Sequence, residues 1–249
     1  MELIKEAFRL GNSAGVILPR SWENRKVKVQ LIEDSILNDV IEILKEKNLL
    51  EHTKGIYLIG SYARGDYDLS SDIDLLVITD DVDKLIKEGN YEIVLISEKN
   101  FSENFSDNIY RLSAIREAKV IINGELLKRL KIINKKINLK KNLKEIRSIF
   151  AINKSVVEDC KELGENVPDG NVYSLVLRLR ELYIIKKLLS DDSINRKEFI
   201  NLIGKKSYDA YLRVKRNKKE FNDLTSKEAV ELLNLTKKWL KELSGRRSQ

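Results

Sequence analysis

One stretch of sequence decides the fold of this chain: residues 56–78 read IYLIGSYARGDYDLSSDIDLLVI. An apolar run ends in Gly60-Ser61, a polar stretch follows, and Asp72 and Asp74 then alternate with apolar residues. This alternation predicts a strand over Ile73–Thr79, with both carboxylates on one face, roughly 6.5 to 7 Å apart along the chain. Two carboxylates so placed can share a pair of divalent ions about 4 Å apart, and Mg²⁺ prefers such oxygen ligands.

A phosphate-binding turn is predicted just before this strand. A helix that begins over Ser61–Asp66 would turn its exposed backbone N–H groups toward an anion. Gly60 would let a phosphate approach the backbone closely, and the Ser61 hydroxyl adds a hydrogen-bond donor. Arg64, one helical turn on, could either neutralise phosphate charge or form an ion pair with one of the aspartates that follow it.

The same stretch resembles the signature of the DNA polymerase β-like nucleotidyltransferase superfamily, and most closely that of its small prokaryotic "minimal" members. The matching residues are Gly60, Ser61, Ala63, Arg64, Gly65, Ser71, Asp72, Ile73, Asp74 and Leu75. The resemblance implies an enzyme of EC 2.7.7 type that transfers a nucleoside monophosphate, with AMP the first expectation, from an NTP to a hydroxyl group. It also implies two Mg²⁺ ions and ATP as the expected substrate.

The resemblance also assigns roles to individual residues. Asp72 and Asp74 would hold the nucleotide-bound ion and help to hold the second one. The family carries a third carboxylate on a following strand, and Glu92 on the predicted strand Tyr91–Ile96 is the position that fits. Glu92 would ligate the catalytic ion and accept the proton of the acceptor; the alternative is a surface residue at a strand edge. Many members have aspartate there, so the longer glutamate changes the metal geometry. The implied nucleotide-binding residues are Gly60, Ser61, Arg64 and Ser71.

The composition is that of a globular protein with a highly charged surface. The 249 residues are 42% hydrophobic and 34% charged, with a net charge of +7. No apolar run approaches the ~20 residues of a membrane span, and we expect no membrane association. The first residues lack an apolar segment of signal-peptide length, and a lone Cys160 excludes an internal disulfide. We therefore expect a cytoplasmic protein.

His52 is the only histidine, which limits the chemistry available. A catalytic Ser-His-Asp or Cys-His arrangement would have to use it, and no nucleophile motif accompanies it. We interpret His52 as part of a surface turn or helix end ahead of the first core strand. The chemistry is therefore expected to depend on carboxylates and metal ions.

Residues 1–33 are predicted to form a separate small unit with strands at Val16–Leu18 and Val27–Ile32. The segment resembles the SpoVT/AbrB-like swapped-hairpin family through Gly11, Ser13, Val16, Leu18, Pro19 and Trp22. In that family two chains interleave their hairpins and many members bind DNA, so the resemblance implies a homodimer and a DNA contact. The bases that could touch DNA phosphates are Arg9, Arg20, Arg25, Lys26 and Lys28. An ordinary hairpin added to the next domain is the alternative.

Two further domains are predicted, giving an α+β fold overall. Residues 34–125 would form the nucleotidyltransferase core with a mixed sheet, opened by a helix that Asp34-Ser35 caps. Residues 126–249 read as a helical bundle, because apolar residues recur at helical spacing and a lone proline, Pro168, stands beside an expected turn at Asp169-Gly170. Basic residues cluster at 128–147 and 213–219.

The acceptor is left open by the sequence. Small enzymes that resemble this one modify a partner protein, typically in toxin–antitoxin pairs, or tRNA ends or small molecules; the basic cluster at 128–147 favours RNA. The alternative function is a DNA-binding regulator or antitoxin that uses the N-terminal hairpin, with a nucleotidyltransferase fold that only binds nucleotide.

Overall fold

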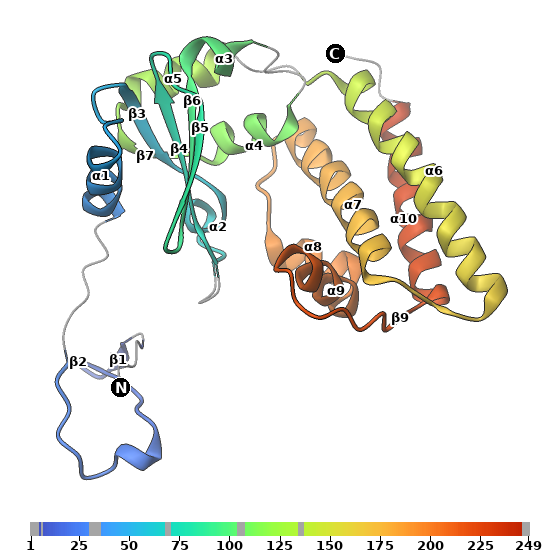
Figure 1. Ribbon diagram of the computed structural model, residues 1–249, viewed down its shortest axis with the longest axis horizontal. Coiled ribbons are helices and arrows are strands. Elements are labelled where there is room, and N and C mark those ends of the chain that lie inside the picture. Colours follow the sequence, from blue (N-terminus) through green and yellow to red (C-terminus); the bar gives the residue numbers. More distant parts are fainter. Residues whose placement is uncertain are drawn as a thin grey trace. The chain divides into compact units, whose positions relative to one another are not determined.

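The computed structural model describes residues 5, 7–29, 36–67, 71–103, 108–133 and 137–245 (Figure 1). The chain divides into two compact units, residues 1–40 and 41–249. A small hairpin, a five-stranded mixed sheet and a set of carboxyl-terminal helices follow one another along the chain. This order confirms the α+β fold that the sequence predicts.

The first unit contains a short antiparallel hairpin, β1 (Phe8–Leu10) and β2 (Ser13–Gly15), and a 3-10 turn, η1 (Arg20–Trp22). The tight turn falls at Gly11-Asn12, where Gly11 has a φ of +59°. The predicted strand at Val16–Leu18 was wrong, and none forms over the described residues of the second predicted strand, 27–29; residues 30–32 lie outside the described part. A strand needs a neighbour for its backbone groups, and among the described residues of a single copy β1 and β2 pair with each other alone.

The second unit is built on a sheet in the order β5-β6-β4-β3-β7. Its strands are β3 (Thr53–Leu58), β4 (Ile73–Thr79), β5 (Lys84–Glu88), β6 (Tyr91–Ser97) and β7 (Lys119–Ile122). β4 and β6 run parallel, and the other neighbours are antiparallel. The predicted strand Ile73–Thr79 is confirmed. The edge strand β5 was not predicted from the sequence. It is short and has exposed side chains on both faces, so it lacks the alternation of apolar and polar residues that marks a half-buried strand.

Short helices flank this sheet. They are α1 (Ile36–Glu46), α2 (Gly60–Arg64), α3 (Glu98–Ser102), α4 (Ile109–Glu117) and α5 (Gly124–Ile133). On one face, Tyr57, Leu76 and Ile78 pack with buried residues of α4 and α5 into a common core. Asp74 shares this face because it lies two residues before Leu76. The predicted helix ahead of the first core strand is confirmed as α1, and its predicted cap at 34–35 lies outside the described residues.

Helices dominate the rest of the chain, as predicted. They are α6 (Leu139–Leu163), α7 (Asp169–Ser190), α8 (Arg196–Ile203), α9 (Lys205–Lys215) and α10 (Ser226–Ser244), with a two-stranded ribbon of β8 (Asn166–Val167) and β9 (Leu224–Thr225). Figure 1 shows α6, α7 and α10 side by side, and their apolar residues share one core. Among the described residues, no helix has both the length and the apolar character of a membrane span.

The expected turn at Asp169-Gly170 was wrong, since α7 begins at Asp169. The carboxylate of Asp169 is fully buried and accepts hydrogen bonds from Arg213 Nε at 2.6 Å and Nη2 at 2.8 Å. Burial is the largest single influence on the pKa of Asp169 and acts to raise it. The pKa is nevertheless lowered, because the hydrogen bonds and charge of Arg213 and the backbone hydrogen bonds of Phe221 and Asn222 together outweigh burial. A buried ion pair therefore lies at the first residue of α7, where the sequence suggested a turn.

Candidate active site

The three predicted carboxylates converge at one end of the sheet. β4 and β6 are paired in register so that Asp74 stands directly opposite Glu92. Directly paired residues of neighbouring strands point to the same face, so these two side chains are neighbours. Asp72 precedes Asp74 by two residues, and the charges of Asp72 and Glu92 both act on the Asp74 carboxyl. Their roles as catalytic residues and metal ligands remain predictions.

Asp74 carries an unfavourable charge in this setting. Its pKa is raised to about 6, first by burial and then by the negative charge of Glu92, with a smaller contribution from Asp72. A half-buried carboxylate beside two others is costly to ionise without a nearby cation. Carboxylate oxygens are the ligands that Mg²⁺ prefers, so the donor types suit a divalent ion. Among the described residues, the ligand atoms of Asp72, Asp74 and Glu92 do not all come within 4.8 Å of one another, so an ion here would also need oxygen atoms of the nucleotide.

Gly60 lies directly against the Asp74 carboxylate. Its φ is +67°, and a β-carbon built on Gly60 would collide with Asp74 Oδ2. The backbone N–H of Ile59 also donates a hydrogen bond to the Asp74 carbonyl at 3.0 Å. The sequence predicts that Gly60 and Ser61 bind phosphate, and both roles stay predictions. The structure adds a second reason for glycine: a side chain here would push Asp74 away.

Arg64 and Ser71 are tied into the structure around the turn. The Arg64 guanidinium is paired with Glu117 of α4 at 2.6 Å and with Asp66 at 3.2 Å. Of the two alternatives that the sequence left open for Arg64, the structure therefore shows the ion pair, and a nucleotide contact remains a prediction. Ser71 Oγ accepts a long hydrogen bond of 3.5 Å from Arg196 Nη1 of α8.

Two cations from the helical region also act on this site. Lys215, at the end of α9, and Arg180 of α7 both lower the pKa of Asp74. Arg180 Nη1 donates to the hydroxyl of Tyr211 at 3.3 Å, which orients the guanidinium. Sequence reasoning assigned no role to Arg180, because nothing local marks it. Lys215 belongs to the basic cluster at 213–219 that the sequence shows.

A third cation stands on the edge strand. Lys87 of β5 is paired directly across the sheet with Glu92, and its Nζ lies 2.7 Å from Glu92 Oε2. The sequence gave no signal for this contact because β5 itself was not predicted. Three cations, Lys87, Arg180 and Lys215, thus surround the three carboxylates.

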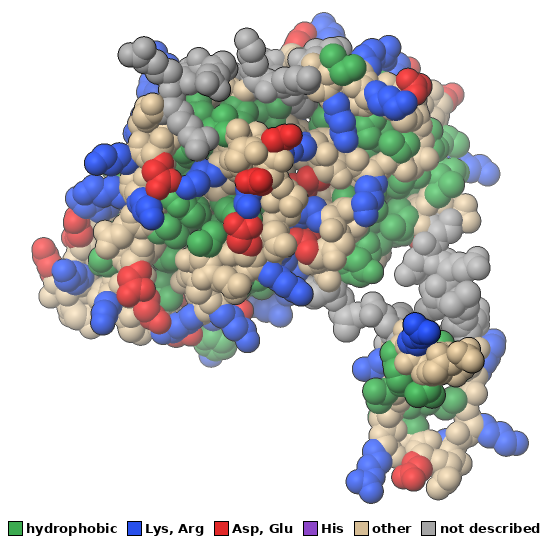
Figure 2. Space-filling model, turned by 180° about the vertical axis from the view of Figure 1, so that it is seen from behind, with side chains coloured by type: hydrophobic (Ala, Val, Ile, Leu, Met, Phe, Trp, Pro, Cys, Tyr) green, Lys and Arg blue, Asp and Glu red, His purple; other side chains and the backbone are tan. Residues whose placement is uncertain are grey.

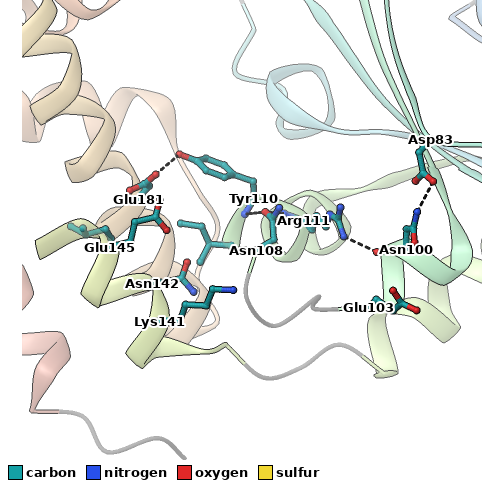
Figure 3. Close-up of a pocket in the computed structure, with 12 residues that line it drawn as sticks. Asp83, Asn100, Glu103, Asn108, Tyr110, Arg111, Lys141, Asn142, Glu145 and Glu181 are labelled. Atoms are coloured by element: carbon teal, nitrogen blue, oxygen red, sulfur yellow. Dashed lines mark hydrogen bonds between the residues drawn. The ribbon is translucent and has the colours of Figure 1, made fainter. Parts of the chain in front are cut away.

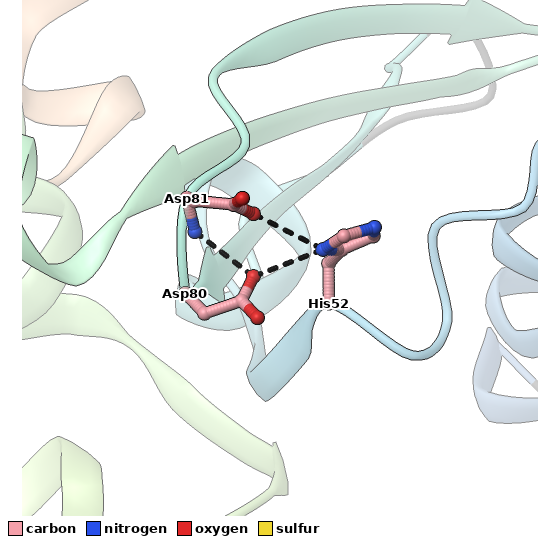
Figure 4. A group of neighbouring side chains, drawn as sticks. All are labelled: His52, Asp80 and Asp81. Carbon is pink, nitrogen blue, oxygen red and sulfur yellow. Dashed lines mark hydrogen bonds and ion pairs between the residues drawn. The ribbon is translucent and has the colours of Figure 1, made fainter.

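A separate group, His52, Asp80 and Asp81, lies at the other end of β4 (Figure 4). His52 Nδ1 is 3.1 Å from Asp80 Oδ1 and 3.0 Å from Asp81 Oδ1. The hydrogen bond with Asp80 is the main reason why the pKa of His52 is raised. The three ligand atoms are close enough together to hold a metal ion; the two aspartates are exposed, and His52 is partly buried. The predicted surface turn at His52 is confirmed.

A polar hollow of about 690 Å³ lies between α4, α6 and α7 (Figure 3). The Tyr110 hydroxyl donates to Glu181 Oε1 at 3.1 Å, and Asn100 Nδ2 donates to Asp83 Oδ2 at 2.6 Å. Asp83 and Asn100 follow the carboxyl-terminal ends of β4 and β6, whereas Asp74 lies near the amino-terminal end of β4. This hollow is therefore distinct from the carboxylate site.

Comparisons with known proteins give one family model and one similar solved structure. Residues 37–159, just under half of the chain, match the family model described as "Nucleotidyltransferase domain". The matched range contains the three carboxylates and Gly60. Among solved structures, a nucleotidyltransferase-like protein from Exiguobacterium sibiricum 255-15 is similar, with 17% sequence identity and a TM-score of 0.32; the match covers 84% of this chain and 75% of that one. No curated protein matches the chain.

Proposed function

We propose that this chain transfers AMP from ATP to a protein hydroxyl in a Mg²⁺-dependent reaction. The chain is an enzyme of EC 2.7.7 type, because its residues 37–159 match the model of a nucleotidyltransferase domain. The observation that carries the proposal is the pairing of Asp74 directly opposite Glu92, with Asp72 near enough for its charge to act on Asp74. The raised pKa of Asp74 supports it, because the mutual repulsion of these groups is relieved when a cation binds between them.

The three carboxylates have different roles in the proposed reaction, since all three bind metal and one also accepts a proton. Asp72 and Asp74 would hold the nucleotide-bound ion, and Glu92 would accept the proton of the acceptor hydroxyl. Mg²⁺, when bound, would supply charge neutralisation for the phosphates and lower the pKa of the hydroxyl. The acceptor oxygen forms a bond to the α-phosphorus, the bond from that phosphorus to the bridging oxygen breaks, and pyrophosphate leaves with the electron pair.

Phosphate recognition falls to the turn and to the helical region. The Gly60 backbone and the Ser61 hydroxyl cradle the β- and γ-phosphates, and Ser71 holds the loop that leads to Asp72. Lys215 and Arg180, which already act on Asp74, are positioned to neutralise the triphosphate on the side of the helices. Most of the rate acceleration would come from positioning and charge stabilisation.

A protein acceptor is favoured over RNA by the state of the basic cluster at 128–147. Lys128 is paired with Glu125 at 2.7 Å, and Arg129 with Glu98 at 3.0 Å. Lys131 Nζ donates to the carbonyl of Arg116 at 3.3 Å. These three side chains are therefore held by partners within the chain, and fewer basic groups of the cluster remain available to contact RNA phosphates. We therefore place the enzyme with the partner-modifying type found in toxin–antitoxin pairs, acting in the cytoplasm.

Label transfer tests the proposal directly. The purified chain is incubated with cell extract and with ATP, CTP, GTP or UTP labelled at the α-phosphate. We expect label from ATP to appear on a protein band with Mg²⁺, and to disappear with EDTA or with the Asp72→Ala/Asp74→Ala variant. Mass spectrometry then identifies the modified hydroxyl. Label that persists in the double variant would refute the assignment, and label on RNA alone would refute the protein acceptor.

A second candidate function rests on the exposed apolar side chains of the first unit. The most exposed are Phe8, Leu10, Ile17, Val27 and Val29, with fractions between 43% and 74%. In Figure 2, apolar side chains of this unit lie at its surface beside Lys and Arg side chains. Segments below ~40 residues seldom bury a core alone. We propose that a second copy of the chain covers these residues and that the dimer presents its bases to DNA.

We expect the intact chain to sediment as a dimer and the variant Leu10→Asp/Ile17→Asp to sediment as a monomer. A charged substitution in an apolar contact costs the free energy of desolvation. Ile152→Asp, at an equally exposed position on α6, serves as the matched control and should leave the dimer intact. A monomeric wild type would refute the dimer. Salt-dependent DNA binding without turnover of any NTP would favour the regulator over the enzyme.

A further inference from the structure

Lys87 completes a row of charged side chains that runs across three strands. The register of β5 with β6 places Lys87 opposite Glu92, and the register of β6 with β4 places Glu92 opposite Asp74. All three side chains therefore lie on one face of the sheet. Lys87 Nζ is 2.7 Å from Glu92 Oε2, within the range of a charge-assisted hydrogen bond.

The ammonium group of Lys87 interacts with all three carboxylates. The pKa of Lys87 is raised, first by the hydrogen bond to Glu92 and also by the charges of Asp72 and Asp74. Lys87 therefore neutralises the carboxylate that a divalent ion at Glu92 would use. An ammonium group 2.7 Å from Glu92 Oε2 also repels a divalent ion that binds to this carboxylate, so the two cations compete for it.

Displacement of Lys87 requires no unfolding. Its side chain is 67% exposed, and that of Glu92 is 34% exposed. A lysine on an edge strand can swing into solvent on its flexible stem, and exposed ion pairs of this kind are weak. The pair can therefore open in response to a competing cation.

We propose, on the basis of the proposed function, that Lys87 is a built-in competitor for the metal ion at Glu92. The two ions of the active site then bind with unequal affinity. The ion held by Asp72, Asp74 and the triphosphate binds first and tightly. The ion at Glu92 binds second and weakly, because the ammonium group of Lys87 repels it. Lys87 thereby raises the concentration of the second ion that the complete metal site needs.

Mn²⁺ binding measured by electron paramagnetic resonance tests this competition. The full chain is titrated with Mn²⁺ in the presence of a non-hydrolysable ATP analogue, so that the readout is ion binding and not turnover. We expect two classes of Mn²⁺ sites in the wild type. In Lys87→Gln the weaker class should tighten by about 3- to 10-fold, the range expected for removing one positive charge near a divalent ion in a solvent-exposed setting. The tighter class should not change.

Lys84→Gln is the matched control. Lys84 lies on the same strand but three residues away, so its side chain points to the opposite face of the sheet. The two variants lose the same charge, and only the change at Lys87 should affect the weaker Mn²⁺ class. A weaker class that is unchanged or weakened in Lys87→Gln would overturn the inference, as would equal tightening in Lys84→Gln.

The same titration separates this inference from the proposed function. Asp74→Asn should remove the tighter Mn²⁺ class. Retention of both classes in Asp74→Asn would refute the metal assignment itself, whatever Lys87→Gln shows. Loss of the tighter class in Asp74→Asn, together with no response to Lys87→Gln, would refute only the competition by Lys87.

Discussion

Gly60→Ala is expected to reduce nucleotide transfer by about 100-fold or more, although the change adds a single methyl group. The added β-carbon would collide with Asp74 Oδ2, so the carboxylate must move away from its place beside Glu92. A displacement of about 1 Å at a reacting centre can cost on the order of 10²-fold in rate. Steady-state label transfer at saturating ATP and Mg²⁺ measures the effect.

Gly65→Ala is the matched control for this prediction. Gly65 has a φ of +78° and Gly60 a φ of +67°, so both substitutions carry the strain of a left-handed conformation, roughly 1–2 kcal/mol. No atom lies within 4 Å of a β-carbon built at Gly65. Urea unfolding should therefore show a similar loss of stability from this strain in both variants, while only Gly60→Ala loses most of its activity. Equal activity in the two variants would contradict the role of the Asp74 contact.

Asp74→Asn is expected to change activity and stability in opposite directions. Loss of a metal-binding carboxylate should reduce transfer by on the order of 10³-fold. In EDTA, however, the variant should be more stable than the wild type at pH 7.5, by about 1–2 kcal/mol. The reason is the raised pKa of Asp74, since the ionised carboxylate is half-buried beside Glu92 and Asp72.

The sign of this effect follows from the pKa of about 6, against an ordinary value of 3.8. The folded protein holds the Asp74 proton more tightly than the unfolded chain does. The destabilising effect of Asp74 is therefore absent below about pH 4 and complete above about pH 6. Urea unfolding in EDTA at pH 4.5, 6 and 7.5 should show the advantage of Asp74→Asn growing with pH.

Asp72→Asn provides the control for the stability measurement. Asp72 is exposed, so its charge is largely screened by solvent, and the same amide substitution should lower activity with little gain in stability. A variant Asp74→Asn that is less stable than the wild type at pH 7.5, or that retains transfer activity, would contradict the prediction.

Local patterns in the sequence predicted the elements whose residues lie next to one another in the chain. The alternation around Asp72 and Asp74 located β4, and the Gly60-Ser61 pair located the start of α2. These features were predictable because strand periodicity and glycine conformations depend on a few adjacent residues. Glu92 could be proposed from one unusual acid at the start of an apolar strand, which is again a local signal.

The unsuccessful predictions also have local causes. The first unit forms its hairpin at Phe8–Gly15, whereas apolar residues at Val16–Leu18 suggested a strand there. Short apolar runs do not say which segments will pair, since pairing depends on a neighbour elsewhere in the chain or in another chain. The edge strand β5 was missed because Ile86 is its one buried residue, which leaves no clear alternation.

By itself, the sequence determined which residue types could hold metal and phosphate, because two of the carboxylates, the glycine and the serine involved lie within one short stretch. Only the tertiary structure decided which of them meet. The pairing of β4 with β6 set Glu92 beside Asp74, and the pairing of β5 with β6 set Lys87 on Glu92. Packing of the helices brought Arg180 and Lys215 close enough for their charges to lower the pKa of Asp74, although both lie more than a hundred residues later in the sequence. Such contacts depend on strand register and on the burial of distant apolar faces, which no short window of sequence contains.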